Sequence, residues 1–103
     1  MKTALIFHFP FHGPWKGEMT EALKPLAADI ASEAGLIFKL WLEDEENGRA
    51  GGIYLFDDAA AAARYRVKHE ARLAASGHQG VEVLSYPVND ALSALTKAGF
   101  AVA

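Results

Sequence analysis

Residues 36–56, LIFKLWLEDEENGRAGGIYLF, decide the fold of this chain. The stretch contains two extended apolar segments, Leu36–Glu43 and Gly52–Phe56, separated by acidic and turn-forming residues, which is the pattern of an antiparallel hairpin. Asn47-Gly48 predicts the centre of the turn, because both residues tolerate the positive φ of a tight hairpin connection. We therefore expect two paired strands around which the rest of the chain is arranged.

Both faces of this hairpin carry apolar side chains. Side chains alternate between the faces of a strand, so Lys39, Trp41 and Glu43 share one face of the first segment. The opposite face is apolar and carries Phe38, Leu40 and Leu42. A sheet with one face in water would alternate between apolar and polar residues. We therefore expect both faces of this sheet to be covered.

The flanking sequence predicts two further strands and two long helices. The strands are expected at Thr3–Phe9 and Val81–Val88, where β-branched and aromatic residues are frequent. The helices are expected over Glu18–Ala34 and from an N-cap at Asp57 or Asp58 to about Ser76. The order βαββαβ is typical of a ferredoxin-like α+β sandwich, in which two helices cover one face of a four-stranded antiparallel sheet.

Three local features modify this arrangement. Pro25 removes a backbone hydrogen bond from the first helix, so we expect a kink or two helical pieces there. A short helix at Ala91–Lys97 is expected after the last strand, capped by Asn89 or Asp90. The tail Gly99–Ala103 is apolar, and we expect it to dock on another part of the structure.

The ferredoxin-like arrangement leaves the second face of the sheet open. Four strands of about seven residues present roughly 400 Å² in projection, about the largest apolar patch that a monomer in water usually exposes. We therefore predict that a second copy of the chain covers this face through a two-fold contact, giving a homodimer.

The composition is that of one globular domain spanning residues 1–103. Hydrophobic residues make up 51% and charged residues 22% of the chain, and the net charge is −3. Because no Lys/Arg cluster accompanies this mild acidity, we expect no nucleic-acid partner and no membrane surface. The chain has no cysteine and no apolar run of about 18 residues, so we expect a cytoplasmic protein without a membrane span.

Several residues are candidates for proton transfer. His69 falls on the apolar stripe of the second helix together with Tyr65, where burial favours a neutral imidazole able to accept a proton. The same position also suits a core histidine that hydrogen-bonds to a backbone carbonyl. Arg72 is a neighbour of His69 on the helix, where it would bind an anion or pair with an acid. His8 and Tyr54, from two strands, are candidates for the same cavity.

The strand residues Lys39, Trp41 and Glu43 form a second constellation. A lysine beside a flat aromatic wall suits a planar, oxygen-rich ligand. Alternatively, Trp41 belongs to the core and both charges reach solvent at the margins of the sheet. Trp15, in the loop Pro10–Gly17, either packs over an edge of the core or lines the mouth of the site.

Familiar cofactor motifs are missing. The sequence contains no phosphate-binding loop, dinucleotide fingerprint or serine-elbow motif. His8 and His12 are four residues apart, but they fall on a predicted strand and a loop with Pro10 between them, so no pair has the helical arrangement of a zinc site and the sequence gives no support for a metal site.

Five segments together resemble the YdhR-type mono-oxygenases. They are HFPFHGPW at His8–Trp15, LKPLAADI at Leu23–Ile30, KLWLE at Lys39–Glu43, AGGIYLF at Ala50–Phe56 and KHEARL at Lys68–Leu73. The resemblance covers nearly the whole chain, and the combination of these segments is specific. It implies a dimeric α/β barrel, in which two ferredoxin-like subunits pack sheet to sheet.

The resemblance also implies an activity: cofactor-independent mono-oxygenation of a small phenolic or polycyclic aromatic substrate with O₂. The protein would then hold the ring flat, exclude water and stabilise the developing negative charge. Trp41, Tyr54 and Trp15 would hold the ring with Tyr65 and Glu43 beside it, His69 or His8 would accept the proton, and Lys39 or Arg72 would stabilise the oxyanion. No Asn-Trp-His haem constellation is recognisable, so no cofactor is expected.

Two other functions remain open at this point. The first is a non-catalytic dimer that binds a small hydrophobic ligand or serves as an interaction module. The second is an isomerase or decarboxylase, because one fold can host several chemistries.

Overall fold

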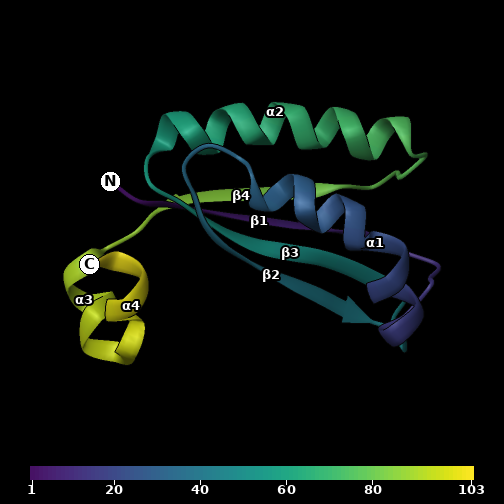
Figure 1. The fold of residues 1–103 in the computed structure, drawn as a ribbon, viewed down its shortest axis with the longest axis horizontal. Helices are drawn as coiled ribbons and strands as arrows, with labels where there is room; N and C mark the ends of the chain where they lie inside the picture. The colour runs from purple at the N-terminus through teal and green to yellow at the C-terminus, as the bar shows by residue number, and fades with distance from the viewer.

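The computed structural model describes residues 1–103 as a four-stranded antiparallel sheet with two long helices on one face (Figure 1). The strands are β1 (Thr3–Pro10), β2 (Leu36–Asp44), β3 (Arg49–Phe56) and β4 (Glu82–Pro87), in the spatial order β2-β3-β1-β4. The covering helices are α1 (Lys16–Ala31) and α2 (Ala59–Ala75). This confirms the predicted ferredoxin-like α+β fold.

The central hairpin forms as expected, with a shorter connection. β3 begins at Arg49 rather than Gly52, and the turn closes with a hydrogen bond from the Gly48 N–H to the Glu45 carbonyl over 3.2 Å. Gly48 has φ +63°, so it supplies the positive φ at the closing position of the turn. The side chain of Asp44 accepts hydrogen bonds from the backbone and the side chain of Asn47. The turn is therefore centred one residue earlier than predicted.

Helix α1 is a single helix, so the expectation of two helical pieces at Pro25 is wrong. Pro25 is exposed, and the carbonyl group that loses its helical partner therefore lies on the solvent side, where water can bind it. Helix α2 matches its predicted range, and its first turn is capped by Asp58, which accepts a hydrogen bond from the Ala61 N–H over 2.8 Å.

The core lies between the sheet and the two helices. Its largest fully buried side chains are Tyr54, Tyr65, Phe7, Phe56, Leu5 and Ile30. Those that belong to β1 and β3 alternate along the strand with residues of the other face. Across the two strands, Leu5 pairs with Tyr54 and Thr3 pairs with Phe56. The covered face of the sheet is therefore an aromatic layer.

The opposite face of the sheet is apolar and exposed. Large side chains from both edge strands lie on it, with exposed fractions of 54% for Leu40, 44% for Leu84 and 57% for Tyr86. Such a face normally has a partner in water.

The C-terminal residues form a separate group of helical turns beyond one end of the sheet (Figure 1). The group contains α3 (Asp90–Ser93), the irregular turn η1 (Ala94–Ala98) and α4 (Gly99–Val102). Lys97 has φ +77°, which breaks the predicted Ala91–Lys97 helix. Within the tail, Ala101 is buried and the ring of Phe100 stacks on Phe38 at 6.3 Å between centroids, although Phe100 itself remains exposed. No helix in the structure combines the length and hydrophobicity needed to cross a membrane.

Candidate functional site

Lys39 lies on the helix-covered face of the sheet between the rings of Trp41 and Tyr54, an arrangement called here the Lys39 nest. In register with β3, Lys39 pairs with Tyr54 and Trp41 pairs with Gly52. The Lys39 amine lies 3.3 Å from the centroid of the Trp41 ring and 4.7 Å from that of Tyr54. Four other lysines form ion pairs with carboxylates, whereas Lys39 has no carboxylate partner.

Burial and, to a smaller extent, the positive charge of Arg72 together lower the pKa of Lys39 to about 7. The ring faces act in the opposite direction, because they attract the ammonium form by about 0.5–2 kcal/mol. Burial can shift a lysine by several pKa units and is therefore the larger effect. The protonation of Lys39 consequently changes near neutral pH.

Gly52 makes room for the Lys39 side chain. A Cβ atom at Gly52 would lie 2.6 Å from Cε of Lys39, 3.1 Å from the Leu40 carbonyl oxygen and 3.2 Å from Cε1 of Tyr54. Of these neighbours, only the end of the lysine chain can move easily. A glycine inside a strand pattern often marks such a close approach.

We expect Gly52→Ala to displace Lys39 from the nest and to return its pKa towards the ordinary lysine value of about 10.4. NMR titration of the lysine Cε resonances measures this shift. Gly17→Ala is the matched control, because nothing lies within 4 Å of the position that its Cβ would take. An unchanged Lys39 pKa in a folded Gly52→Ala protein would contradict this account.

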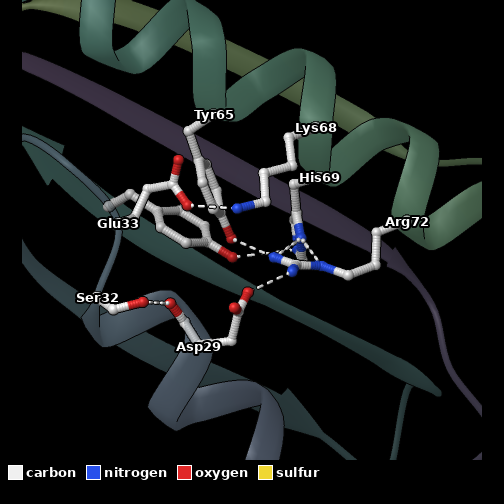
Figure 2. A network of polar contacts seen from close by, with 8 residues as sticks. Asp29, Ser32, Glu33, Tyr65, Lys68, His69 and Arg72 are labelled. Carbon is white, nitrogen blue, oxygen red and sulfur yellow. Dashed lines mark hydrogen bonds and ion pairs between the residues drawn. The ribbon is translucent and has the colours of Figure 1, made fainter.

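His69 is held by a polar network that links α1 and α2 (Figure 2). Arg72 donates hydrogen bonds from Nε and Nη2 to Nδ1 of His69 over 3.2 and 3.1 Å. The Nη1 atom of Arg72 donates to Oδ2 of Asp29 over 2.8 Å. A second link joins Lys68 of α2 to Glu33 over 2.9 Å.

These contacts define the protonation of His69. A guanidinium group only donates hydrogen bonds, so Nδ1 of His69 accepts and the ring proton is on Nε2. Nε2 lies 3.3 Å from the hydroxyl oxygen of Tyr54, to which it donates. Burial, followed by the charges of Lys39 and Arg72, lowers the pKa of His69 to about 3. His69 is therefore neutral at physiological pH, and both of its nitrogen atoms are engaged.

The two tyrosines beside His69 stay protonated. Burial raises the pKa of Tyr54 and of Tyr65 above the usual tyrosine value. The Tyr65 ring stacks on His69 at 5.1 Å between centroids and 20° between planes. Tyr65 thus fixes the orientation of the imidazole.

Two hollows adjoin the Lys39 nest, and three residues line both of them. An inner cavity of about 70 Å³ is lined by Lys39, Tyr54 and His69 together with Phe7 and other apolar residues. A groove of about 240 Å³ lies between α1 and β2. Met19, Leu23 and Trp41 line both hollows. Trp41 is 38% exposed, so a planar ligand in the groove can reach its ring.

The model of the family described as "Putative mono-oxygenase ydhR" matches residues 4–99. The chain belongs to this family. No curated protein matches the chain at the level of sequence.

Solved structures share the fold of this ydhR-family chain at low sequence identity. SnoaB of Streptomyces nogalater, a cofactor-independent oxygenase, has a TM-score of 0.61 and 18% identity over 85% of this chain and 93% of its own. NE2512 of Nitrosomonas europaea, a protein of unknown function, has a TM-score of 0.57 and 16% identity over 85% and 89%. A protein of Deinococcus radiodurans described as a "putative antibiotic biosynthesis monooxygenase" has a TM-score of 0.55 and 16% identity over 86% and 93%.

Of the site residues predicted for this ydhR-family chain, the structure brings Lys39, Trp41, Tyr54, His69 and Arg72 together. His8 is not among them. It lies on the opposite, open face of the sheet, where Nδ1 is 2.6 Å from Nη2 of Arg49 and Nε2 is 3.0 Å from Oε2 of Glu82. The expectation that His8 shares a cavity with His69 is therefore corrected, because strand alternation places it on the wrong side.

Two further predicted residues lie at the margin of the site. Glu43 lines the groove, and its Oε1 accepts a hydrogen bond from the backbone N–H of Lys16 over 2.8 Å at the start of α1. Trp15 precedes α1 and packs edge-on against Phe11 at 5.2 Å, outside the residues that line the inner cavity. The packing interpretation of Trp15 therefore fits its position better.

Two contributors to the site were not predicted from the sequence. Asp29 lies on the polar side of α1, and only the approach of the two helices shows that it binds Arg72. His78 had the pattern of a loop residue, but it lines the inner cavity and packs on Phe9 at 4.8 Å. No cluster of His, Asp or Glu residues in the structure has the arrangement of a metal site.

Proposed function

We propose that this protein is a cofactor-independent mono-oxygenase that oxidises a small phenolic or polycyclic aromatic substrate with O₂. Membership of the mono-oxygenase family supports this proposal, as does the shared fold with a cofactor-independent oxygenase. The observation that carries it is the Lys39 amine between the rings of Trp41 and Tyr54, next to a neutral His69 and a cationic Arg72.

In this proposal the substrate ring lies against the exposed part of Trp41 in the groove, and its oxygen reaches into the inner cavity that Lys39 lines. A flat ring and a nearby cation suit a planar substrate that becomes an anion. The inner cavity of about 70 Å³ is too small for a polycyclic compound, so most of the ring system lies in the groove of about 240 Å³.

We assign the proton-accepting role to Lys39 rather than to His69. A catalytic base works best when its pKa lies near the working pH. The pKa of Lys39 is about 7, whereas that of His69 is about 3 and both of its nitrogen atoms are engaged. The resulting ammonium group and Arg72 then stabilise the substrate anion.

The chemistry balances without a cofactor. For an anthrone-like substrate, Lys39 takes the proton and the carbanion-enolate transfers one electron to O₂. The carbon radical and superoxide combine, and after protonation by Lys39 they form a hydroperoxide. Loss of water leaves a carbonyl group, so that a CH₂ group and O₂ give C=O and H₂O.

Oxygen uptake by the purified protein tests the proposal. With an anthrone-like or quinol substrate in air and a metal chelator present, we expect uptake of one O₂ for each molecule of anthrone oxidised. Binding without uptake would favour the non-catalytic ligand-binding module. Conversion of substrate without uptake would favour an isomerase or decarboxylase, and uptake abolished by the chelator would contradict a metal-free mechanism.

The pH dependence of the reaction distinguishes the two possible roles of Lys39. If the neutral amine is the base, kcat/KM rises with pH and reaches half of its maximum near pH 7, the pKa of Lys39. The substrate should have a pKa above about 9, so that its own ionisation does not contribute. A kcat/KM that instead falls as the pH rises through 7 would show that the ammonium form is required from the start.

We also propose that the working form is a homodimer, a dimeric α/β barrel closed by the open faces of two sheets. The exposed side chains of Leu40, Leu84 and Tyr86 support this, since they form an apolar surface on one face. A two-fold contact would cover this surface in both copies.

A further inference from the structure

We propose that Lys39 is also a covalent carbonyl-binding site, which condenses with small planar aromatic aldehydes to form an imine. This reactivity goes beyond the proposed oxygenation and needs no O₂. The geometry points to it through three features of the nest: an amine without a counter-ion, a flat ring beside that amine, and a hollow from which a ligand can approach.

The first feature is the unpaired amine. An amine attacks a carbonyl group only in its neutral form, and a carboxylate partner would hold it as ammonium. Lys24, on the rim of the same groove, forms such a pair with Glu21 at 2.8 Å. The titratable groups that face Lys39 from α2 are instead the cationic Arg72 and the neutral His69. The carboxylate of Asp29, from α1, is bound to Arg72. Burial adds to this by lowering the pKa of Lys39 to about 7.

The second feature is the position of the amine over Trp41. An aldehyde attached to an aromatic ring can lie against the exposed part of Trp41 in the groove while its carbonyl group enters the inner cavity, which Lys39 lines and which shares Met19, Leu23 and Trp41 with the groove. Gly52 preserves this position, because any side chain there would collide with Cε of Lys39. Binding next to the reacting group converts the condensation into an effectively intramolecular step.

The step requires no other reactant. The nitrogen lone pair of Lys39 adds to the carbonyl carbon, and a proton moves from nitrogen to the carbonyl oxygen to give a carbinolamine. The carbinolamine then loses its hydroxyl group and the second N–H proton as water, which leaves a C=N bond. Amine and aldehyde thus give imine and water, with no change of oxidation state.

Reductive trapping tests this inference. The protein is incubated at neutral pH under argon with benzaldehyde or 2-naphthaldehyde and sodium cyanoborohydride, and adducts are located by peptide mapping. Peptide mapping also separates Lys39 from the N-terminal amine, which is the main competitor because its pKa lies near 8. An ordinary lysine is about 1,000-fold less deprotonated at neutral pH than one with a pKa near 7, so we expect Lys39 to react at least about tenfold faster than Lys24.

Matched variants show whether Lys39 and Trp41 are responsible for the adduct. Lys39→Met is expected to remove the dominant adduct, and Lys97→Met, at an exposed lysine that lines neither the groove nor the inner cavity, to leave it unchanged. Trp41→Leu is expected to slow trapping of the aromatic aldehydes but not of acetaldehyde. Adducts confined to Met1 and the exposed lysines in the folded wild-type protein would overturn the inference.

The outcome is separable from that of the proposed function. Trapping at Lys39 together with no oxygen uptake in air would uphold the imine site and refute the oxygenase. Oxygen uptake without trapping at Lys39 would support the oxygenase and refute the imine site.

Discussion

Lys39→Met is expected to lower kcat/KM for aerobic oxidation of a phenolic substrate by about 100- to 10,000-fold, which is the usual contribution of a general base. Methionine fills a similar volume beside Trp41 and Tyr54 but cannot accept a proton, so the nest keeps its shape and loses its base. Oxygen-electrode kinetics with a substrate that is neutral at the assay pH measure the effect. The pH dependence centred near 7 should disappear in the same variant.

Two controls accompany this measurement. Lys97→Met removes an exposed lysine of the C-terminal turns, which lines neither the groove nor the inner cavity, and should leave kcat/KM within about twofold. Thermal unfolding of Lys39→Met checks that the variant is folded. Full activity in a folded Lys39→Met protein would remove Lys39 from the mechanism and leave the proposed function without the observation that carries it.

The sequence predicted the parts of the site that lie on one element. Alternation along β2 correctly put Lys39, Trp41 and Glu43 on one face, because a strand fixes side-chain direction with a period of two. The helical stripe of α2 correctly buried Tyr65 and His69. These are local rules, and they apply before any tertiary contact is known.

The sequence could not predict how elements approach one another. Whether β2 turns Lys39 towards the helices or towards the open face depends on the register with β3 and on a bulge between Leu36 and Phe38. The hydrogen bonds of His69 depend on Arg72 and, through it, on Asp29 of the other helix. For this reason the sequence indicated His69 as a base, whereas its surroundings hold it neutral with both nitrogen atoms engaged.

Strand β2 contributes side chains to both faces of the sheet. Lys39 and Trp41 point to the proposed site, and Leu40 and Leu42 lie between and beyond them on the exposed face. A partner that covers Leu40 would therefore restrain the strand that carries the Lys39 nest. In this way the homodimer and the proposed chemistry are coupled through β2.

Leu40→Glu is accordingly expected to dissociate the homodimer into particles of 11.1 kDa. Leu40 is 54% exposed on the open face, and a two-fold contact would bury the new carboxylate once in each copy. Burying an unpaired charge costs several kcal/mol, so the dissociation constant should rise at least about 100-fold. Sedimentation velocity at micromolar concentration distinguishes the two states.

Val67→Glu is the matched control, because Val67 is 72% exposed on α2, on the other side of the molecule from the open face of the sheet. It adds the same charge and should leave the dimer intact. If both variants dissociate, the change reflects net charge rather than the proposed contact. If the wild-type protein itself sediments at 11.1 kDa, the apolar face formed by Leu40, Leu84 and Tyr86 has another occupant and the barrel is wrong.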